Sequence, residues 1–464
     1  MQTKHEIVTV TAPASKSMSH RALIAAALAK GECAVEGVLD SVDLRITRTC
    51  LEAAGAVFMR KGDRLLVAGF EGGPKGGGQG QDPTGKGLPV DIFVNESGTS
   101  CRLLAAVLAA GQGLFRVHGA PRMHERPIGE LARALEALGA TFTWEGREGC
   151  PPFVLKASGL AGGEVGISLE ESSQYLSGLL LAAPLARGSV TIRLMGGKAL
   201  SWPYVALTLK VMQDFRIRFE VQRLEGEGGK AQWIAVPWRS LKSAEPGRVR
   251  FLVHPGEYDP SDYRVEGDWS NGSYLLAAGA VGPRPVRVEG LHADSLQGDR
   301  AILEILSQMG AKIATDYTGV TVSPAPLRGV CVDMGRCPDI VPTVAVVAAF
   351  AHGETVISGV PHLRIKECDR LNAMSSQLAR AGCAVEDTPD GLRILGRGSE
   401  VLKSGQDVEF TTFGDHRIAM SLSLLGFAGL GVRLDDPGCV SKSFPDFFLE
   451  WAKLVQSTGQ GGAA

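Results

Sequence analysis

The sequence predicts an α/β protein built from six copies of one supersecondary unit. First, a polar or basic cluster followed by an Ala/Leu-rich stretch recurs six times, at intervals of roughly 70 to 95 residues. Second, each apolar stretch ends near a glycine, and a Val-rich segment follows it. Third, a second helical pattern lies inside the copies and stops at a glycine, as at residues 51–57, 135–140, 306–311 and 378–383. Helices interleaved with strands in this way predict a βαβαββ unit.

The six polar clusters are predicted to begin the first helix of each copy. They lie at residues 17–21, 97–102, 172–174, 270–273, 339–343 and 415–417. A helix N-terminus carries unpaired N–H groups and partial positive charge, so it attracts anions. The repeat therefore predicts a protein that binds phosphate or carboxylate groups, without specifying which molecule carries them.

The length predicts two domains, because 464 residues exceed what one hydrophobic core usually supports. Six units divide into two groups of three, with the break near residues 263–266. Residues 222–250 lack the periodicity of the repeat and are predicted to be an insertion near the end of the third unit. The glycine-rich segment 72–78 is predicted to form a flexible surface loop.

Composition argues against several classes of protein. A formal net charge of −2 disfavours a general nucleic-acid binder. Nine scattered cysteines without a CxxC pair indicate a reducing cytosol rather than a disulfide framework or a zinc site. The apolar stretches are interrupted before about 18 residues, and the N-terminal residues do not resemble a signal peptide. We therefore expect a cytoplasmic protein without a membrane span.

Cations and hydroxyl groups accumulate in the polar clusters. Lys16, Ser17 and Arg21 surround the first helix start, where two cations oppose the dipole preference for carboxylates. Arg122 and Arg126 lie in a turn that enters a helix, and arginine can grip a carboxylate or a phosphate with two hydrogen bonds. Taken singly, each residue fits a helix cap or a solvated charge. Their recurrence at equivalent places of the repeat predicts a shared anion site.

The clusters resemble the motifs of the 5-enolpyruvylshikimate-3-phosphate synthase family over nearly the whole chain. The matching segments are Pro-x-Ser-Lys-Ser…Arg (13–21), Ser-Gly-Thr-Ser-x-Arg (97–102), Pro-Arg-Met-x-Glu-Arg-Pro-Ile (121–128), Ser-Ser-Gln (172–174), Val-Glu-Gly-Asp-Trp-Ser (265–270), Leu-Gln-Gly-Asp (296–299), Arg-Ile-Lys-Glu-x-Asp-Arg-Leu (364–371), Asp-His-Arg (415–417) and Lys-Ser-Phe-Pro (442–445). Their number and order make a chance match improbable.

The resemblance implies a two-domain inside-out α/β barrel with six βαβαββ repeats, three per domain, helices inside and sheets outside. It implies one domain at residues 15–264, including the insertion at about 222–250. The second domain would combine residues 1–14 with 265–464, because the chain crosses twice. The active site would lie in the cleft between the domains, with hinges near residues 14–16 and 262–266.

The resemblance also implies transfer of the enolpyruvyl group of phosphoenolpyruvate to the 5-hydroxyl of shikimate 3-phosphate, with release of phosphate. Asp339 would be the base, Glu367 the acid, and Lys16 would share in proton transfer. Shikimate 3-phosphate would contact Ser17, Arg21, Ser172, Ser173, Gln174, Ser201, Tyr204, Asp339, His362 and Lys366. Phosphoenolpyruvate would contact Lys16, Gly98, Arg126, Gln174, Arg370, Arg417 and Lys442. No metal or organic cofactor is expected, since the reaction has no redox step, and a monomer is the expected state.

One position departs from the family pattern. The residue two places before Gly98 is usually Asn, whereas this chain has Glu96, with Asn95 one place earlier. A carboxylate at the edge of a phosphoenolpyruvate site would repel the ligand unless it points away or is paired. We expect a local shift of the chain in which Asn95 takes the role of the family's Asn and the Glu96 side chain points elsewhere.

Two alternative functions are open at this point. A UDP-N-acetylglucosamine enolpyruvyl transferase shares the fold, but its motif has a reactive cysteine that the stretch at 121–125 lacks, and Cys101 fits core packing better. A non-catalytic anion-binding relative would be expected to lose Asp339, Glu367 or Lys16 first. All three are present, yet Glu96 keeps this alternative open.

Overall fold

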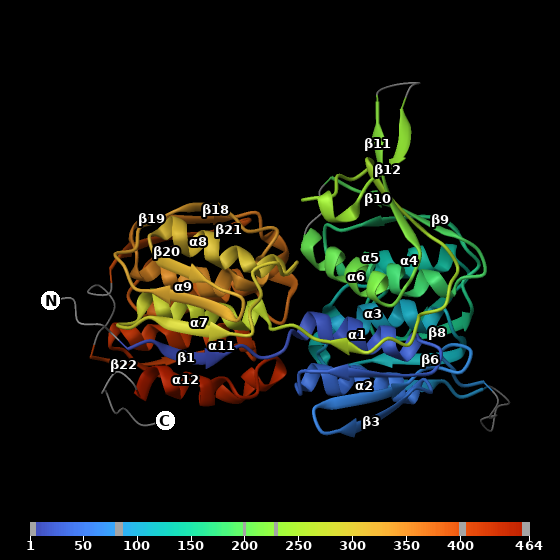
Figure 1. Cartoon of the computed structure of the whole chain (residues 1–464), viewed down its shortest axis with the longest axis horizontal. Helices are drawn as coiled ribbons and strands as arrows, with labels where there is room; N and C mark the ends of the chain where they lie inside the picture. The colour runs from blue at the N-terminus through green and yellow to red at the C-terminus, as the bar shows by residue number, and fades with distance from the viewer. Residues whose placement is uncertain (1–5, 79–86, 198–200, 227–230, 399–404, 457–464) are drawn as a thin grey trace. The chain divides into compact units, whose positions relative to one another are not determined.

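The computed structural model describes residues 6–78, 87–197, 201–226, 231–398 and 405–456 (Figure 1). It divides into two compact units. The N-terminal unit is Lys16–Val265, and the C-terminal unit combines Met1–Ser15 with Glu266–Ala464. Each unit is built around its own helices, so each positions its own set of polar side chains.

The N-terminal unit holds the first three copies of the repeat. Its helices are α1 (Lys16–Leu28), α2 (Val42–Ala53), α3 (Gly98–Ala109), α4 (Gly129–Ala137), α5 (Gln174–Ala182) and α6 (Trp202–Asp214). Its strands are β2 (Glu32–Glu36), β3 (Val57–Lys61), β4 (Arg64–Ala68), β5 (Val90–Phe93), β6 (Gln112–His118), β7 (Thr141–Trp144), β8 (Phe153–Ser158), β9 (Gly163–Ser168), β10 (Val190–Met195), β11 (Phe219–Glu225), β12 (Gln232–Ala235), β13 (Val249–Val253) and β14 (Tyr263–Arg264).

The C-terminal unit holds the other three copies. Its helices are α7 (Trp269–Val281), α8 (Ile302–Met309), α9 (Val341–Phe350), α10 (Arg370–Arg380), α11 (His416–Ser423) and α12 (Phe447–Gln456). Its strands are β1 (Val8–Thr11), β15 (Val286–Glu289), β16 (Lys312–Thr315), β17 (Gly319–Ser323), β18 (Cys331–Asp333), β19 (His352–Ser358), β20 (Ala384–Thr388), β21 (Gly391–Arg397), β22 (Asp407–Phe410) and β23 (Gly431–Leu434).

Each complete copy forms one sheet with the same topology. In the second copy β5 pairs parallel with β6, β6 pairs antiparallel with β8, and β7 pairs with β8 at the edge. The same order recurs in the sheets β14-β2-β4-β3, β1-β15-β17-β16 and β18-β19-β21-β20. The predicted βαβαββ unit is therefore confirmed in these copies, with β14 and β1 supplying the first strands of the first and fourth.

Two copies depart from this plan. The third forms a five-stranded sheet, because β12 from the predicted insertion pairs antiparallel with β11. The β11–β12 hairpin extends away from the rest of its own unit (Figure 1). The sixth copy contains β22, α11, β23 and α12, and its sheet has only two strands among the described residues.

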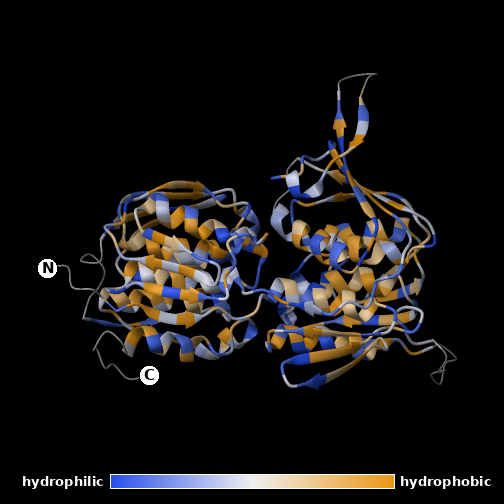
Figure 2. Cartoon of the chain, viewed as in Figure 1, coloured by the Kyte–Doolittle hydropathy of each residue, from blue (hydrophilic) through white to orange (hydrophobic). Residues whose placement is uncertain are grey.

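The first helix of each copy is buried on all sides, whereas the second has one exposed face. All ten residues of α9 and twelve of the thirteen residues of α7 are buried. In α10, by contrast, six of the eleven residues are buried. A helix that is apolar all round belongs in a core, and the strands alternate buried and exposed residues, as in β8 and β10. The helices thus lie inside each unit beneath the sheets (Figure 2).

The prediction of a flexible loop at residues 72–78 is wrong for most of this segment. Lys75 bridges to Gln112 and Gly77 bridges to Leu114, so the segment extends the edge of the second sheet. A side chain at Gly76 would collide with the backbone of Leu114 and Gly113. The glycines therefore serve close packing of two backbones rather than loop mobility.

Candidate active site

The structure confirms that the six polar clusters lie at helix starts. Helices α1, α3, α5, α7, α9 and α11 begin at or within three residues of the clusters. Ser97, Asp268 and Asp415 are N-caps whose side chains accept a hydrogen bond from the backbone of the first turn. Such caps satisfy donors that the helix itself leaves unpaired. The backbone thus fixes the functional side chains at the starts of buried, well-packed helices.

Arg370 is the centre of the charged cluster in the C-terminal unit. Its side chain is 2% exposed, and its Nε donates to Asp415 Oδ2 over 2.7 Å. Its Nη1 donates to Asp339 Oδ1 over 3.1 Å and its Nη2 to Glu367 Oε2 over 2.9 Å. Burial alone would lower the pKa of Arg370, but the carboxylates of Asp415, Glu367 and Asp339 outweigh it and raise that pKa. Arg370 therefore stays charged.

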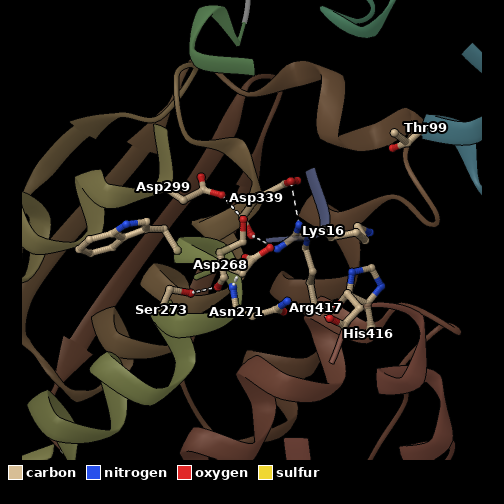
Figure 3. Close-up of polar contacts among 12 residues, drawn as sticks. Lys16, Thr99, Asp268, Asn271, Ser273, Asp299, Asp339, His416 and Arg417 are labelled. Atoms are coloured by element: carbon tan, nitrogen blue, oxygen red, sulfur yellow. Dashed lines mark hydrogen bonds and ion pairs between the residues drawn. The ribbon is translucent and has the colours of Figure 1, made fainter. Parts of the chain in front are cut away.

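Asp339 links Arg370 to a second guanidinium, that of Arg417. Arg417 Nη2 donates to Asp339 Oδ2 over 2.8 Å, and Arg417 Nη1 donates to the Asp339 carbonyl oxygen over 3.3 Å. Figure 3 shows the Asp339 carboxylate and the Arg417 guanidinium facing one another. Two arginines fix the orientation of this carboxylate. An oriented carboxylate can accept a proton from a bound hydroxyl.

Glu367 and Lys442 form a second contact of the same cluster. Lys442 Nζ lies 3.7 Å from Glu367 Oε1, and both side chains are largely buried, at 10% and 13% exposed. Lys442 is the last residue of the short helix η10 (Pro437–Lys442). Glu367 thus lies between one arginine and one lysine, each of which contacts a different oxygen of its carboxylate.

A strained turn delivers Asp415 to this cluster. Phe413 adopts φ +56°, a left-handed conformation that is costly for a bulky side chain. Thr412 donates both its backbone N–H and its hydroxyl to Asp435 Oδ1, each over 2.8 Å. These bonds hold the strained turn, which places Asp415 both as the cap of α11 and as the partner of Arg370.

The segment Leu296–Asp299 supports the start of α7. Gln297 Oε1 accepts hydrogen bonds from Ser15 Oγ and the Trp269 N–H, each over 3.1 Å, and its Nε2 donates to Glu266 Oε1 over 2.9 Å. Asp299 accepts a hydrogen bond from Ser270 Oγ. Burial, followed by repulsion from Asp339, raises the pKa of Asp299 to about 7.

Arg21 is a buried cation of the N-terminal unit. Its Nε donates to Thr208 Oγ1 over 2.7 Å, and its other donors reach the carbonyl oxygens of Ser17 and Tyr204 and the hydroxyl of Ser177. None of these partners within the described chain is a carboxylate. Burial lowers the pKa of Arg21 to about 10. Its charge is therefore solvated by neutral groups alone, so an anion placed beside it would be strongly attracted.

Lys16 forms an ion pair with a carboxylate of its own unit. Lys16 Nζ lies 3.3 Å from Asp43 Oδ2, and the two side chains are 12% and 5% exposed. Asp43 lies in the first turn of α2, where a carboxylate is stabilised by the helix dipole. Asp43 therefore fixes the direction of the lysine side chain.

Gly98 and Arg126 lie in direct contact. A Cβ atom built on Gly98 would collide with the guanidinium of Arg126, so a larger residue here would force Arg126 to move. Arg126 is buried, and its Nη1 donates to the backbone carbonyl of Glu96 over 3.0 Å. The Glu96 side chain is exposed, and Asn95 adopts the left-handed conformation with φ +47°. The carbonyl of residue 96 thus faces the arginine.

Gln174 is oriented by Arg102. Arg102 Nη1 donates to Gln174 Oε1 over 3.0 Å, so the Gln174 amide nitrogen is left to donate to Thr99 Oγ1 over 2.9 Å. Arg102 also donates to the carbonyl of Pro127, the residue after Arg126. Ser172 and Ser173, directly before α5, are both buried. This arginine thus braces two predicted ligand contacts.

The remaining predicted residues also lie at element ends. Ser201 precedes α6 with φ +57°, and Tyr204 is half-buried in its first turn. His362 is buried in the short helix η7 (Pro361–Ile365), and Lys366 directly follows it. The structure brings Asp339, Glu367, Arg370, Arg417 and Lys442 into one cluster of the C-terminal unit. It brings Ser17, Arg21 and Tyr204 together in the N-terminal unit.

Sequence reasoning gave no site role to several residues that hold these groups. Arg102 and Asp299 lie in the motifs at 97–102 and 296–299, so these motifs could have indicated that both residues support the site. Asp415 was part of a quoted motif but was not expected to bind Arg370, 45 residues earlier in sequence. Asp43 carried no signal, because its pairing with Lys16 arises only from the packing of α1 on α2.

No group of three or more His, Cys, Asp or Glu side chains in the described chain is arranged to hold a metal ion. None of the helices that the structure describes is both long and apolar enough for a membrane span. The cysteines at the described positions are all free thiols.

Comparison with known proteins identifies the family of the chain. A sequence model of the EPSP synthase family (3-phosphoshikimate 1-carboxyvinyltransferase) matches residues 4–233 and 242–451. The 3-phosphoshikimate 1-carboxyvinyltransferase of Shewanella denitrificans is 39% identical over 451 residues, covering 96% of each chain. That of Histophilus somni is 37% identical over 455 residues, covering 97% of this chain and 96% of the relative.

Solved structures show the same fold. EPSP synthase from Acinetobacter baumannii superposes with a TM-score of 0.73 at 24% identity, covering 97% of this chain and 96% of the other. The enolpyruvyl transferase NikO from Streptomyces tendae superposes with a TM-score of 0.68 at 19% identity, over 97% and 95%. The solved structures show the fold, and the family model and the relatives show that the chain is an enolpyruvyl transferase. Within that class, the family match and the relatives show that the chain belongs to the EPSP synthase family.

Proposed function

We propose that the chain transfers the enolpyruvyl group of phosphoenolpyruvate to the 5-hydroxyl of shikimate 3-phosphate and releases phosphate, a step of aromatic amino acid biosynthesis. The relatives that carry this enzyme name cover almost the whole chain. The observation that carries the chemistry is that Asp339 and Glu367 are both bound to the Arg370 guanidinium. Addition followed by elimination needs a base for the hydroxyl and an acid for the methylene carbon, and this pair offers both.

In the addition step, Asp339 takes the proton of the 5-hydroxyl as its oxygen bonds to C2 of phosphoenolpyruvate. Glu367 gives a proton to C3, so the methylene becomes a methyl group. In the elimination step, Glu367 takes a proton back from that methyl group as the bond between C2 and the phosphate oxygen breaks. Lys16 would donate a proton to this bridging oxygen as the bond breaks, so that phosphate leaves in a protonated form. The proton held by Asp339 then passes to solvent and Lys16 takes one from solvent, which returns the enzyme to its starting state.

The cations divide between the two substrates in this proposal. Arg370, Arg417, Lys442, Lys16 and Arg126 would neutralise phosphoenolpyruvate, with Gly98 and Gln174 nearby. Shikimate 3-phosphate would contact Ser17, Arg21, Ser172, Ser173, Gln174, Ser201, Tyr204, Asp339, His362 and Lys366. Arg21 supports this assignment best, because its charge is surrounded by neutral groups and lacks a carboxylate partner in the described chain. Because the reaction joins the two substrates, the phosphoenolpyruvate contacts and the shikimate 3-phosphate contacts must be made at the same time.

A coupled phosphate-release assay tests the proposal. Shikimate 3-phosphate and phosphoenolpyruvate together should yield phosphate, and omission of either substrate should abolish the signal. If no phosphate appears although calorimetry shows that both compounds bind, the chain is a non-catalytic anion-binding relative. UDP-N-acetylglucosamine in place of shikimate 3-phosphate should give no phosphate.

We also propose that the enzyme acts as a monomer in the cytoplasm. The free thiols support a reducing compartment. Sedimentation of the purified chain at several concentrations should give one species with the mass of a single chain, 48.9 kDa.

A further inference from the structure

The polar cluster at the start of α7 is buried, although it contains little charge. Ser270, Asn271 and Ser273 are all at most 8% exposed. The proposed function gives none of them a role with either substrate. Ser270 and Ser273 are occupied by bonds inside the fold, to Asp299 and Thr343. Asn271 differs from them, because its side chain reaches the segment that carries Lys442.

Asn271 holds the residue that follows Lys442 at two points. Asn271 Nδ2 donates to the backbone carbonyl of Ser443 over 2.9 Å, and Ser443 Oγ donates to Asn271 Oδ1 over 3.4 Å. Ser443 is 1% exposed, and its N–H donates to the Val440 carbonyl over 3.1 Å. Every backbone and side-chain polar group of Ser443 therefore has a partner, and Asn271 supplies two of them.

Asn271 is itself fixed before it makes these contacts. Its backbone N–H donates to the cap residue Asp268 over 2.8 Å, so the amide side chain starts from a rigid first turn (Figure 3). A short polar side chain in such a turn has few alternative positions, because the surrounding core is close-packed. The turn after η10 is thus anchored to the start of a buried helix 172 residues earlier.

We propose that Asn271 is a positioning residue for Lys442, and through it for the phosphoenolpyruvate site. Lys442 ends η10, and its backbone is bonded directly to that of Ser443, so displacement of Ser443 displaces Lys442. Lysine acts on a phosphate or carboxylate as a point charge on a flexible stem, so its backbone anchor decides where the charge lies. A misplacement of a binding or catalytic group by about 1 Å can lower kcat/KM by up to about 100-fold. This inference rests on the proposed function.

Replacement of Asn271 by Ala tests the inference in the full-length chain. The Ser443 carbonyl then loses its partner, and the turn that carries Lys442 relaxes. We expect the KM for phosphoenolpyruvate to rise about tenfold, while kcat and the KM for shikimate 3-phosphate change less than about twofold, the pattern of lost ground-state binding. Ser273→Ala is the matched control, since it removes a buried hydroxyl of the same helix that does not contact Ser443; its KM should stay at the wild-type value.

A double-mutant cycle with Lys442→Ala separates positioning from general loss of stability. If Asn271 acts through Lys442, Asn271→Ala should add less than about twofold to the KM for phosphoenolpyruvate once Lys442 is absent. A multiplicative effect in the double variant, or an unchanged KM in the single variant, would overturn the inference.

Asn271→Ser, which keeps a short donor, is the substitute if Asn271→Ala does not fold, and it should raise the KM for phosphoenolpyruvate by a smaller factor. Wild-type turnover is measured first, because its absence contradicts the proposed function rather than the role of Asn271.

Discussion

Arg370 and Asp415 form a deeply buried ion pair in the C-terminal unit: Arg370 Nε donates to Asp415 Oδ2 over 2.7 Å, and the side chains are 2% and 0% exposed. Asp415 also caps α11 by accepting from the Arg417 N–H over 2.9 Å. The Asp415 carboxylate therefore orients Arg370 by binding its guanidinium and Arg417 by binding its backbone N–H. Both arginines are proposed ligands of phosphoenolpyruvate, so this pair joins the stability of the unit to its site.

Asp415→Asn should therefore destabilise the unit and weaken the site together. Asn can still cap α11, so the loss is mainly that of charge beside Arg370. Breaking a buried pair typically costs about 3–5 kcal/mol, whereas partly exposed pairs contribute about 0–1 kcal/mol. Denaturant unfolding should show this contrast with Asp387→Asn, which removes the partner of Arg364 in a pair that is 30% and 25% exposed. Equal losses in the two variants would contradict it.

Asp339→Asn should separate chemistry from binding. The amide keeps the shape of the side chain and one hydrogen-bond acceptor for Arg370 or Arg417, but it cannot take a proton. Turnover should fall by about 10² to 10⁴-fold, the usual contribution of a positioned base. Calorimetry of both substrates should show little change in affinity. Turnover within about threefold of wild type would exclude Asp339 as the base.

The sequence predicted the six helix starts because each is a local pattern: a cap, an apolar helix and a glycine stop. Gly310, with φ +110°, ends α8 as the glycine rule predicts. The partners of the charged side chains could not be predicted, because the pairs form only when separate elements pack together. Lys16–Asp43 joins two helices of one copy, and Arg370–Asp415 joins two copies of the repeat. The edge pairing of residues 75–77 was also missed, because glycines that permit close backbone contact have the same composition as a loop.

Glu96→Asn should change the KM for phosphoenolpyruvate less than about twofold, since exposed charges are screened by solvent and salt. The sequence alone suggests tighter binding on removal of a like charge. The structure instead shows an exposed Glu96 side chain and a backbone carbonyl that faces Arg126. The KM should be compared with wild type at low and at physiological salt. A marked decrease at both would show that the carboxylate acts on the ligand.

Asp299 should make stability depend on pH. Its pKa is raised from 3.8 to about 7 by burial and then by Asp339. The folded state thus binds a proton more tightly than the unfolded state, so this group lowers stability as pH rises from about 4 to about 7, with no further change above that. Asp299→Asn keeps an acceptor for Ser270 and removes the titration. The midpoint of thermal unfolding of the variant, minus that of wild type, should increase across this range and then level off; a difference independent of pH would contradict the assignment.

Gly98→Ala should weaken phosphoenolpyruvate binding by moving Arg126 rather than by disturbing α3. The added methyl group would collide with the Arg126 guanidinium, which must swing away and lose its bond to the Glu96 carbonyl. Alanine favours a helix more than glycine does, so the helix itself should not suffer. We expect the KM for phosphoenolpyruvate to rise about tenfold or more, in keeping with the cost of about 1.5–3 kcal/mol for losing a charged hydrogen bond. Gly426→Ala is the control, because a Cβ there has no neighbour within 4 Å. If Arg126→Ala raises the KM and Gly98→Ala raises it as much again in that background, the two residues act independently and the steric explanation is wrong.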